Sequence, residues 1–271
     1  MGGGPEHFVR NGIERALRDD GYEVAVECVE ARSPFRAEIK TAFELYRTLA
    51  ERVRAACEGG AFPLVLSGNC NSSLGTVAGV GADGLGVVWF DAHGDFNTPE
   101  TTESGFLDGM GLATAAGLCW KKMAASIPNF RPVAGDRLLH VGGRDFYPEE
   151  RALFEQAGGT IVGAELIRQT GVAEALGPAL EALGARAARV YLHFDLDVLD
   201  PASAPANEFA APDGLDVGQV REAVRMIGER FNVCAGAVAS YDPGCDKGDE
   251  VLGAGVAIIK SILSAAARGR D

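Results

Sequence analysis

Residues 85–97 read LGVVWFDAHGDFN, an apolar and aromatic run followed from Asp91 by alternating acidic and imidazole side chains. The apolar half predicts a strand buried on both faces, as in a parallel sheet covered by helices. Ligands of such sheets collect at the carboxyl ends of the strands. The stretch therefore indicates an α/β fold with its chemistry where this strand ends.

Similar apolar runs recur along the chain and alternate with longer stretches of helical period, which is the pattern of an α/β protein. Strands are predicted at 22–29, 63–68, 85–93, 137–143, 160–164, 189–197 and 233–240, and helices at 36–58, 165–183, 215–230 and 248–268. No linker, repeat or change of composition interrupts the pattern. We therefore expect residues 1–271 to form a single domain.

The composition argues against several classes of function. The 271 residues include 38 acidic and 25 basic side chains, and the net charge is -13. Nucleic acid and anionic membranes are unsuitable partners because both require a positive surface. No apolar run approaches the ~20 residues of a membrane helix, and the first residues do not resemble a signal peptide. We expect a cytoplasmic protein.

Two predicted strand ends are rich in acidic residues. Asp91, His93 and Asp95 alternate after one strand, and Asp195 and Asp197 end another in the segment FDLDVLDP. An isolated carboxylate is costly to bury, so four acids and one imidazole at two strand ends predict bound divalent cations. The alternative is that both segments are solvated acidic turns or helix N-caps.

These segments resemble the motifs of the ureohydrolase family, which comprises arginases, agmatinases and related amidine hydrolases. WFDAHGDFNTPETTESG (89–105) is similar to the strand, first ligand cluster and substrate loop of the family, and FDLDVLDP (194–201) to its second cluster. LSGNCNSSLGT (66–76) stands where the family has its GGDH segment, and DPGCD (242–246) matches its last substrate-contacting turn. The resemblance covers most of the chain.

The resemblance implies a three-layer αβα fold with a mostly parallel central sheet. Residues 2–17, GGGPEHFVRNGIERAL, resemble the early glycine turn and helix of the family. The strand that precedes this turn in the family has no counterpart here. Either the sheet lacks that edge strand or the natural chain starts upstream.

A binuclear manganese site is also implied by the resemblance. Its carboxylate and imidazole ligands in this chain are Asp91, His93, Asp95, Asp195 and Asp197. Asp91 and Asp195 bridge the two ions in this scheme. His93 and Asp197 complete the ligands of one ion, and Asp95 belongs to the other.

The second ion in the family also binds a histidine of the GGDH segment, and Cys70 stands at that position here. A thiolate is a softer ligand than imidazole, and it favours Zn²⁺, Fe²⁺ or Co²⁺ over Mn²⁺. Three outcomes are open: a dinuclear site with one sulfur ligand, a site with one metal, or an empty second position.

The implied chemistry is hydrolysis of a linear C–N bond. Two cations can hold one water between them and lower its pKa from ~15.7 toward neutrality, which yields hydroxide that attacks a trigonal carbon. Asp95 is the candidate to accept the proton and pass it to the leaving nitrogen. Asp108 stands where arginases have a proton-shuttling histidine, and it is the second catalytic candidate.

The substrate loop keeps several polar residues. Asn97, Thr102 and Ser104 lie where the family binds the amino-acid end of its substrate. Phe106 replaces a polar neighbour and makes this rim less hydrophilic. The resemblance therefore implies a small polar ligand with a site that departs from that of the arginases.

The last turn departs further. Ser240 stands where arginases have a glutamate that grips the guanidinium, and Asp242 is the candidate to replace its charge. We predict a ureohydrolase-like amidinohydrolase that acts on a guanidino or amidino compound. The alternative is a relative with weakened or lost turnover that binds metal or ligand or serves as an assembly subunit. Family members are commonly trimers or hexamers, so the resemblance implies a homo-oligomer.

Overall fold

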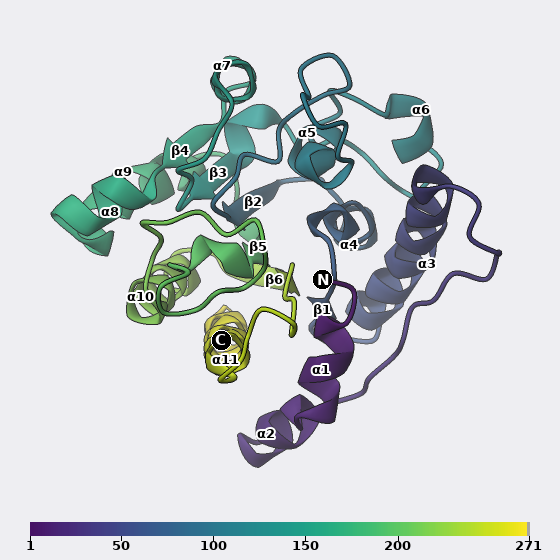
Figure 1. Ribbon diagram of the computed structural model, residues 1–271, viewed down its shortest axis with the longest axis horizontal. Helices are drawn as coiled ribbons and strands as arrows, with labels where there is room; N and C mark the ends of the chain where they lie inside the picture. Colours follow the sequence, from purple (N-terminus) through teal and green to yellow (C-terminus); the bar gives the residue numbers. More distant parts are fainter. Residues whose placement is uncertain (270–271) are drawn as a thin grey trace.

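Six parallel strands form one sheet at the centre of the protein (Figure 1). The computed structural model describes residues 1–269. The strands are β1 (Leu64–Leu66), β2 (Leu85–Phe90), β3 (Leu138–Val141), β4 (Thr160–Val162), β5 (Arg189–Asp195) and β6 (Asn232–Ala239), in the spatial order β1-β6-β5-β2-β3-β4. Because all strands run in one direction, their carboxyl ends share one edge of the sheet.

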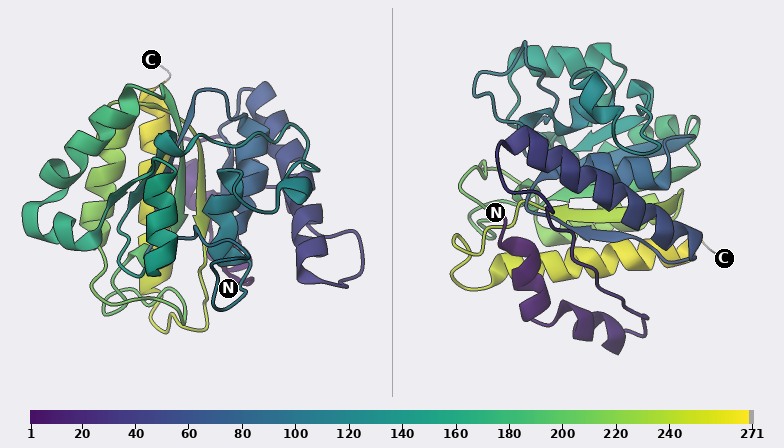
Figure 2. Two further views of the ribbon diagram at one scale, coloured as in Figure 1. Left: turned by 90° about the horizontal axis from the view of Figure 1, so that it is seen from above. Right: turned by 90° about the vertical axis from the view of Figure 1, so that its right-hand side faces the viewer.

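Helices cover both faces of the sheet (Figure 2, left). One face carries α3 (Glu38–Glu58), α4 (Ser73–Val80), α5 (Gly111–Ala115) and α6 (Lys121–Ala124); the other carries α8 (Ala164–Thr170), α9 (Val172–Gly184), α10 (Val217–Gly228) and α11 (Glu250–Arg268). The chain begins with α1 (Gly4–Arg10) and α2 (Ile13–Asp19), and α7 (Pro148–Gln156) follows β3. The predicted three-layer αβα fold is confirmed.

Alternation along β2 divides the core into two layers. Val88 and Phe90 pack with α9, α10 and α11, whereas Val87 and Trp89 pack into the opposite layer. Successive side chains of a strand point to opposite faces, so a strand covered on both sides is apolar throughout. All six residues of β2 are buried, as the sequence pattern predicts.

The predicted strand at 22–29 is wrong. These residues have no regular secondary structure, and most of their side chains are exposed. Tyr22 and Val24 pack against the core, and the carbonyl oxygen of Val24 accepts a hydrogen bond from Arg18 at 3.0 Å. A strand requires a neighbour for its backbone groups, and no described strand pairs with this segment.

The predicted helix at 165–183 is two helices. Gly171 separates α8 from α9 with φ of 85°, a left-handed conformation that glycine adopts readily. In contrast, α10 begins with a capping box in which Asp216 and Gln219 each bond the backbone of the other. The helical period of the apolar residues predicts the helical segment, but it does not reveal that Gly171 divides this segment into two helices.

Helix α11 is long and apolar enough to span a membrane, which the sequence analysis did not anticipate. It packs against β6 and α10, and its buried face is formed by Val251, Ala254, Gly255, Ile258, Ile259, Ile262, Ala265 and Ala266. Its Lys260 lies 2.8 Å from Asp20 of the N-terminal region. This packing is that of a core helix.

Candidate metal centre

The register of the sheet brings the two acidic segments together. Phe90 of β2 lies opposite Phe194 of β5, and their rings stack with centroids 4.2 Å apart. The residues that follow, Asp91 and Asp195, therefore leave the sheet side by side. Both carboxylates are buried.

One group of ligand atoms consists of Asp91, His93 and Asp197. Nδ1 of His93 lies 3.4 Å from Oδ1 of Asp91 and 3.3 Å from Oδ2 of Asp197. The backbone amide of His93 also donates to Oδ1 of Asp91 at 2.7 Å. Ligand atoms of the three residues all lie within 4.8 Å of one another, so they can converge on one ion.

A second group consists of Cys70, Asp91 and Asp95, whose ligand atoms also lie within 4.8 Å of one another. Cys70 begins a short 3-10 helix after β1, and its sulfur lies 3.0 Å from Oδ2 of Asp195. Asp91 belongs to both groups. The structure therefore brings together two adjacent ligand sets that share one carboxylate.

Two residues at this edge adopt left-handed backbone conformations although neither is glycine. Asp95 has φ of 49° and Ser240 has φ of 62°. The carbonyl oxygen of Asp95 accepts hydrogen bonds from the amides of Leu112 and Ala113, and that of Ser240 accepts one from Asn207. Such conformations are costly, and they concentrate at functional sites where surrounding contacts enforce them.

Burial makes the carboxylates difficult to ionise without a counter-charge. Five acidic side chains are buried around the cluster: Asp91, Asp95, Asp108, Asp195 and Asp197. Desolvation, with repulsion from Asp197, raises the pKa of Asp91 to about 7. Burial and the neighbouring carboxylates raise the pKa values of Asp95 and Asp195 well above the ordinary range. The cluster thus has more acidic groups than it can ionise alone.

His93 and Asp197 form the charge-balanced part of the cluster. Burial alone would lower the pKa of His93, but its hydrogen bonds to Asp197 and Asp91 raise it to about 12. The pKa of Asp197 is lowered despite its burial, because His93 and the amide of Ala92 donate to it. Without metal, the proton on His93 balances one carboxylate.

The residues present fit divalent cations. Arg144 lies nearby, but it gives its N–H groups to backbone carbonyl oxygens, among them those of Asp197 and Leu199. One imidazolium does not balance the remaining buried acids. Carboxylates, an imidazole and a thiol are all metal-ligand types, and cations would satisfy the excess of negative groups. A thiol binds a metal ion only after it has lost its proton. Burial and the neighbouring Asp195 raise the pKa of Cys70 well above its usual range, so a cation must displace this proton to bind the sulfur.

Asp108 is buried beside the segment that carries Cys70. Its Oδ1 accepts from the amide of Asn71 at 2.8 Å, and its Oδ2 accepts from Nδ2 of Asn69 at 2.9 Å. Burial raises its pKa, and these hydrogen bonds oppose the rise. Asp108, the second catalytic candidate, thus bonds the backbone of Asn71 and the side chain of Asn69, the two residues that flank Cys70.

The predicted residues of the substrate loop are bonded mainly within the loop. Oδ1 of Asn97 accepts from Thr101 at 3.1 Å. The hydroxyl oxygens of Thr102 and Ser104 accept from the amides of Gly105 and Phe106. These side chains lie after β2, as predicted, and their oxygens hold the shape of the loop.

The two predicted residues of the last turn differ in position. Oγ of Ser240 lies 3.5 Å from the sulfur of Cys70, so this side chain belongs to the cluster. The carboxylate of Asp242 accepts from the amide of Gly244 within its own turn and lies 3.7 Å from the amino nitrogen of Met1. The structure thus places Ser240, and not Asp242, against the ligands.

Sequence reasoning missed two residues that hold the ligands. Nε1 of Trp89 donates to Oδ2 of Asp91 at 3.0 Å, and Nδ2 of Asn207 lies 3.4 Å from Oδ2 of Asp197. Trp89 precedes Asp91 by two residues, so alternation along the strand could have signalled its contact. No comparable pattern identifies Asn207, which reaches the cluster from a long loop.

Two histidines lie beneath the cluster in the sheet. His140 and His193 flank Trp89 on the neighbouring strands, and the His193 ring stacks on Trp89 at 3.7 Å. Burial lowers the pKa of each to about 3. Both are therefore neutral core residues.

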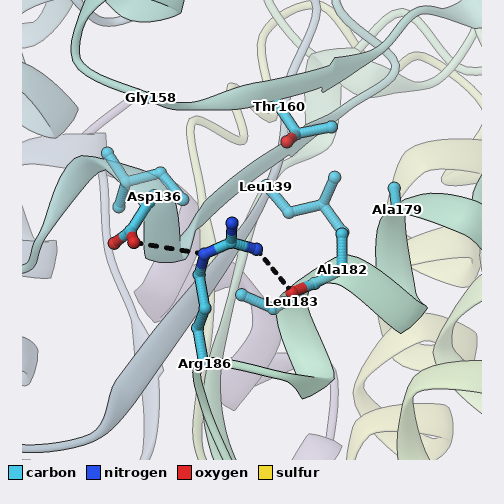
Figure 3. Close-up of a pocket in the computed structure, with 9 residues that line it drawn as sticks. Asp136, Leu139, Gly158, Thr160, Ala179, Ala182, Leu183 and Arg186 are labelled. Carbon is cyan, nitrogen blue, oxygen red and sulfur yellow. Dashed lines mark hydrogen bonds and ion pairs between the residues drawn. The ribbon is translucent and has the colours of Figure 1, made fainter.

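A separate cavity of about 150 Å³ lies at the opposite edge of the sheet, where β3 and β4 begin (Figure 3). Arg186 donates to Asp136 at 3.2 Å and to the carbonyl oxygen of Ala182 at 2.8 Å. None of the predicted site residues lines this cavity. The candidate site is therefore the carboxylate cluster.

An αβα sheet with two acidic ligand sets at its carboxyl edge is the architecture of the ureohydrolase class. The model of the arginase family matches residues 9–264. The chain therefore belongs to the arginase family, and the predicted membership of the ureohydrolase family is confirmed.

Individual relatives support this assignment. The arginase of Bacillus caldovelox is 29% identical over 230 residues, which cover 83% of this chain and 76% of that protein. The N(omega)-hydroxy-L-arginine amidinohydrolase of Streptomyces lavendulae is 30% identical over 209 residues, covering 76% and 71%. The crystal structure of arginase from Bacillus subtilis superposes with a TM-score of 0.87 at 27% identity, covering 96% of this chain and 91% of that one. The predicted enzyme class, a ureohydrolase-like amidinohydrolase, is confirmed at the level of the family.

Proposed function

We propose that this protein is a metal-dependent hydrolase that cleaves a C–N bond of a guanidino or amidino group in a small substrate. The whole chain forms one catalytic domain in this proposal. The observation that carries it is the pair of ligand sets that share Asp91. Hydrolases of this family use binuclear sites, usually of manganese, and two adjacent sets with a common carboxylate suit such a site.

Two divalent ions are assigned to the cluster. The residues that would hold them are those of the two ligand sets, together with Asp195, which lies 3.0 Å from the sulfur of Cys70: Asp91, His93, Asp197, Asp95, Cys70 and Asp195. Manganese is the metal that family membership favours, whereas the sulfur of Cys70 shifts the preference toward Zn²⁺, Fe²⁺ or Co²⁺. When bound, the ions supply a water of lowered pKa at neutral pH and neutralise negative charge that develops in the reaction.

The side chains of the protein hold the substrate and move the proton. The carboxylate of Asp95, fixed by its left-handed backbone, accepts a proton and returns it to the leaving nitrogen. Asp108 holds the segment of Cys70 in place and is the second candidate for proton transfer. Ser240 faces the reacting end of the substrate, and Asn97, Thr102, Ser104 and Asp242 belong to its outer surroundings.

We further propose that the protein works in the cytoplasm as a homo-oligomer, as the resemblance to the ureohydrolases implies. Its partner is the small substrate. The net charge of -13 supports the expectation that nucleic acid is not a partner, since binding to a polyanion requires a positive surface.

Metal analysis combined with a substrate screen tests the proposal. Protein purified without added metal is analysed for Mn, Zn, Fe and Co, then loaded with each metal and tested for urea release from guanidino compounds. We expect close to two metal equivalents per chain and hydrolysis of at least one compound. Absence of metal after loading, together with absence of turnover, would favour the alternative of a relative that has lost catalysis.

A further inference from the structure

Two exposed phenylalanines contact each other, and both belong to loops that carry residues of the ligand cluster. The rings of Phe106 and Phe209 lie with centroids 5.9 Å apart and an interplanar angle of 30°. They come from different loops, one after β2 and the other after β5. Phe106 is 40% exposed and Phe209 is 49% exposed, so the pair leaves apolar surface open to solvent.

Each ring is anchored close to the ligands. Phe106 precedes Asp108 by two residues, and Asp108 holds the amide of Asn71 next to Cys70. The amide of Phe209 donates to Oδ1 of Asn207, whose Nδ2 lies 3.4 Å from Asp197. The pair thus joins the loop on the Cys70 side of the cluster to the loop on the Asp197 side.

The same loops offer no cation to an acidic substrate. Residues 97–108 and 200–214 contain no Lys or Arg, and they include Glu100, Glu103 and Glu208, all exposed. A carboxylate at the far end of a substrate would meet negative charge here. These charges are exposed, so salt weakens both the repulsion of a carboxylate and the attraction of a cation at these loops.

The polar groups of the substrate loop are also partly used. The oxygens of Asn97, Thr102 and Ser104 already accept hydrogen bonds from their own loop. Apolar surface is therefore the feature of this rim that remains most available. Aromatic rings favour both apolar groups and other rings in offset or edge-on contact.

We infer that Phe106 and Phe209 select a substrate whose non-reacting end is uncharged and apolar, an alkyl or aryl group carried on the guanidino compound. The inference rests on the proposed function, because it assigns the reacting end to the metal cluster. It makes the two phenylalanines specificity-determining residues.

Three probes that share a butylguanidine core test it: phenylbutylguanidine, guanidinopentanoate and aminobutylguanidine. Urea release by the metal-loaded enzyme gives KM for each. We expect KM for phenylbutylguanidine to be lower than the other two by on the order of tenfold, as burial of an aromatic ring predicts. Phe106→Ser and Phe209→Ser should each raise that KM by about 3–10-fold and leave the value for guanidinopentanoate unchanged.

Phe35→Ser is the matched control, because Phe35 is 74% exposed and lies before α3. It should leave all three KM values unchanged. The inference would be overturned if the three probes had equal KM values or if the carboxylate or ammonium compound had the lowest KM. It would also be overturned if Phe106→Ser and Phe209→Ser had no effect on KM.

Failure of the proposed function is distinguishable from failure of this inference. If no probe releases urea, the proposed reaction is refuted for these compounds, and calorimetric binding of phenylbutylguanidine becomes the readout. Binding that weakens in Phe106→Ser and Phe209→Ser, but not in Phe35→Ser, supports the apolar rim. Binding that is equal in all variants, or absent, contradicts it.

Discussion

The sulfur of Cys70 lies 3.0 Å from Oδ2 of Asp195, although 125 residues separate them in the chain. Ser240 approaches the same sulfur to 3.5 Å. Because burial raises its pKa, the thiol of Cys70 keeps its proton in the metal-free protein and donates a hydrogen bond to Asp195. Binding of a cation to the second ligand set must therefore displace this proton, and the choice of metal depends on it.

Cys70→His should change the metal preference. An imidazole binds Mn²⁺ better than a thiol that must first lose its proton. We expect a higher manganese content and a lower ratio of zinc to manganese in protein grown with both metals, measured by elemental analysis. Cys119→Ser is the control, because Cys119 is also buried but bonds Thr114 away from the cluster. Equal metal contents of the wild type and Cys70→His would show that Cys70 is not a ligand.

Asp91→Asn should weaken both ligand sets at once, because Asp91 belongs to both. We expect the metal content to fall from about two equivalents to below one, and hydrolysis to fall by about 100-fold or more. The metal-free variant should unfold at a higher temperature than the metal-free wild type, since a buried acid with a raised pKa has been removed. Asp83→Asn, at an exposed position, is the matched control. Retention of both metals in Asp91→Asn would contradict the shared site.

The stability of the metal-free protein should fall as the pH rises from about 4 to about 7. The unfolded chain releases the proton of Asp91 in the ordinary range, whereas burial holds it in the folded protein up to a pKa of about 7. Asp95 and Asp195 act in the same direction. The folded state thus binds more protons in this window, and the free energy of unfolding decreases with pH. Urea denaturation at several pH values measures it; the fall should be shallower in Asp91→Asn, and an equal fall in both proteins would refute this origin.

Asn207→Ala should destabilise the protein by about 1–3 kcal/mol. The amide of Asn207 joins the carbonyl oxygen of Ser240, at 2.9 Å, to the carboxylate of Asp197. Its removal leaves the strained Ser240 backbone without that support. Gln169→Ala is the comparison, because Gln169 bonds Glu165 on the surface of α8, and it should cost less than about 0.5 kcal/mol. Chemical denaturation without metal compares the two, and equal losses would argue against the bridging role.

Much of the fold and of the ligand cluster was predictable because the patterns that indicate them lie within short segments of the sequence. The apolar run of β2 predicts a buried strand, and Asp91 and Asp195 follow directly on two such runs. Parallel strands deliver their carboxyl ends to one edge, so adjacency in space follows from the fold class. The resemblance adds Cys70, which no local pattern marks as a ligand.

What was not predictable depends on contacts between distant segments. Residues 22–29 have the composition of a strand, but whether they pair depends on a neighbour that the pattern does not reveal. Asn207 and the ring pair of Phe106 and Phe209 arise where long loops meet. Their conformations are set by tertiary contacts rather than by period or composition.

The bond from Trp89 to Asp91 gives the protein an intrinsic optical reporter. The sequence contains two tryptophans, and the other, Trp120, points its indole N–H at the sulfur of Met110. A cation bound at Asp91 would alter the electric field at the Trp89 ring, so emission from this indole would report occupancy without an added dye. Titration in a fluorimeter can thus follow loading of the centre in real time, before any substrate is known.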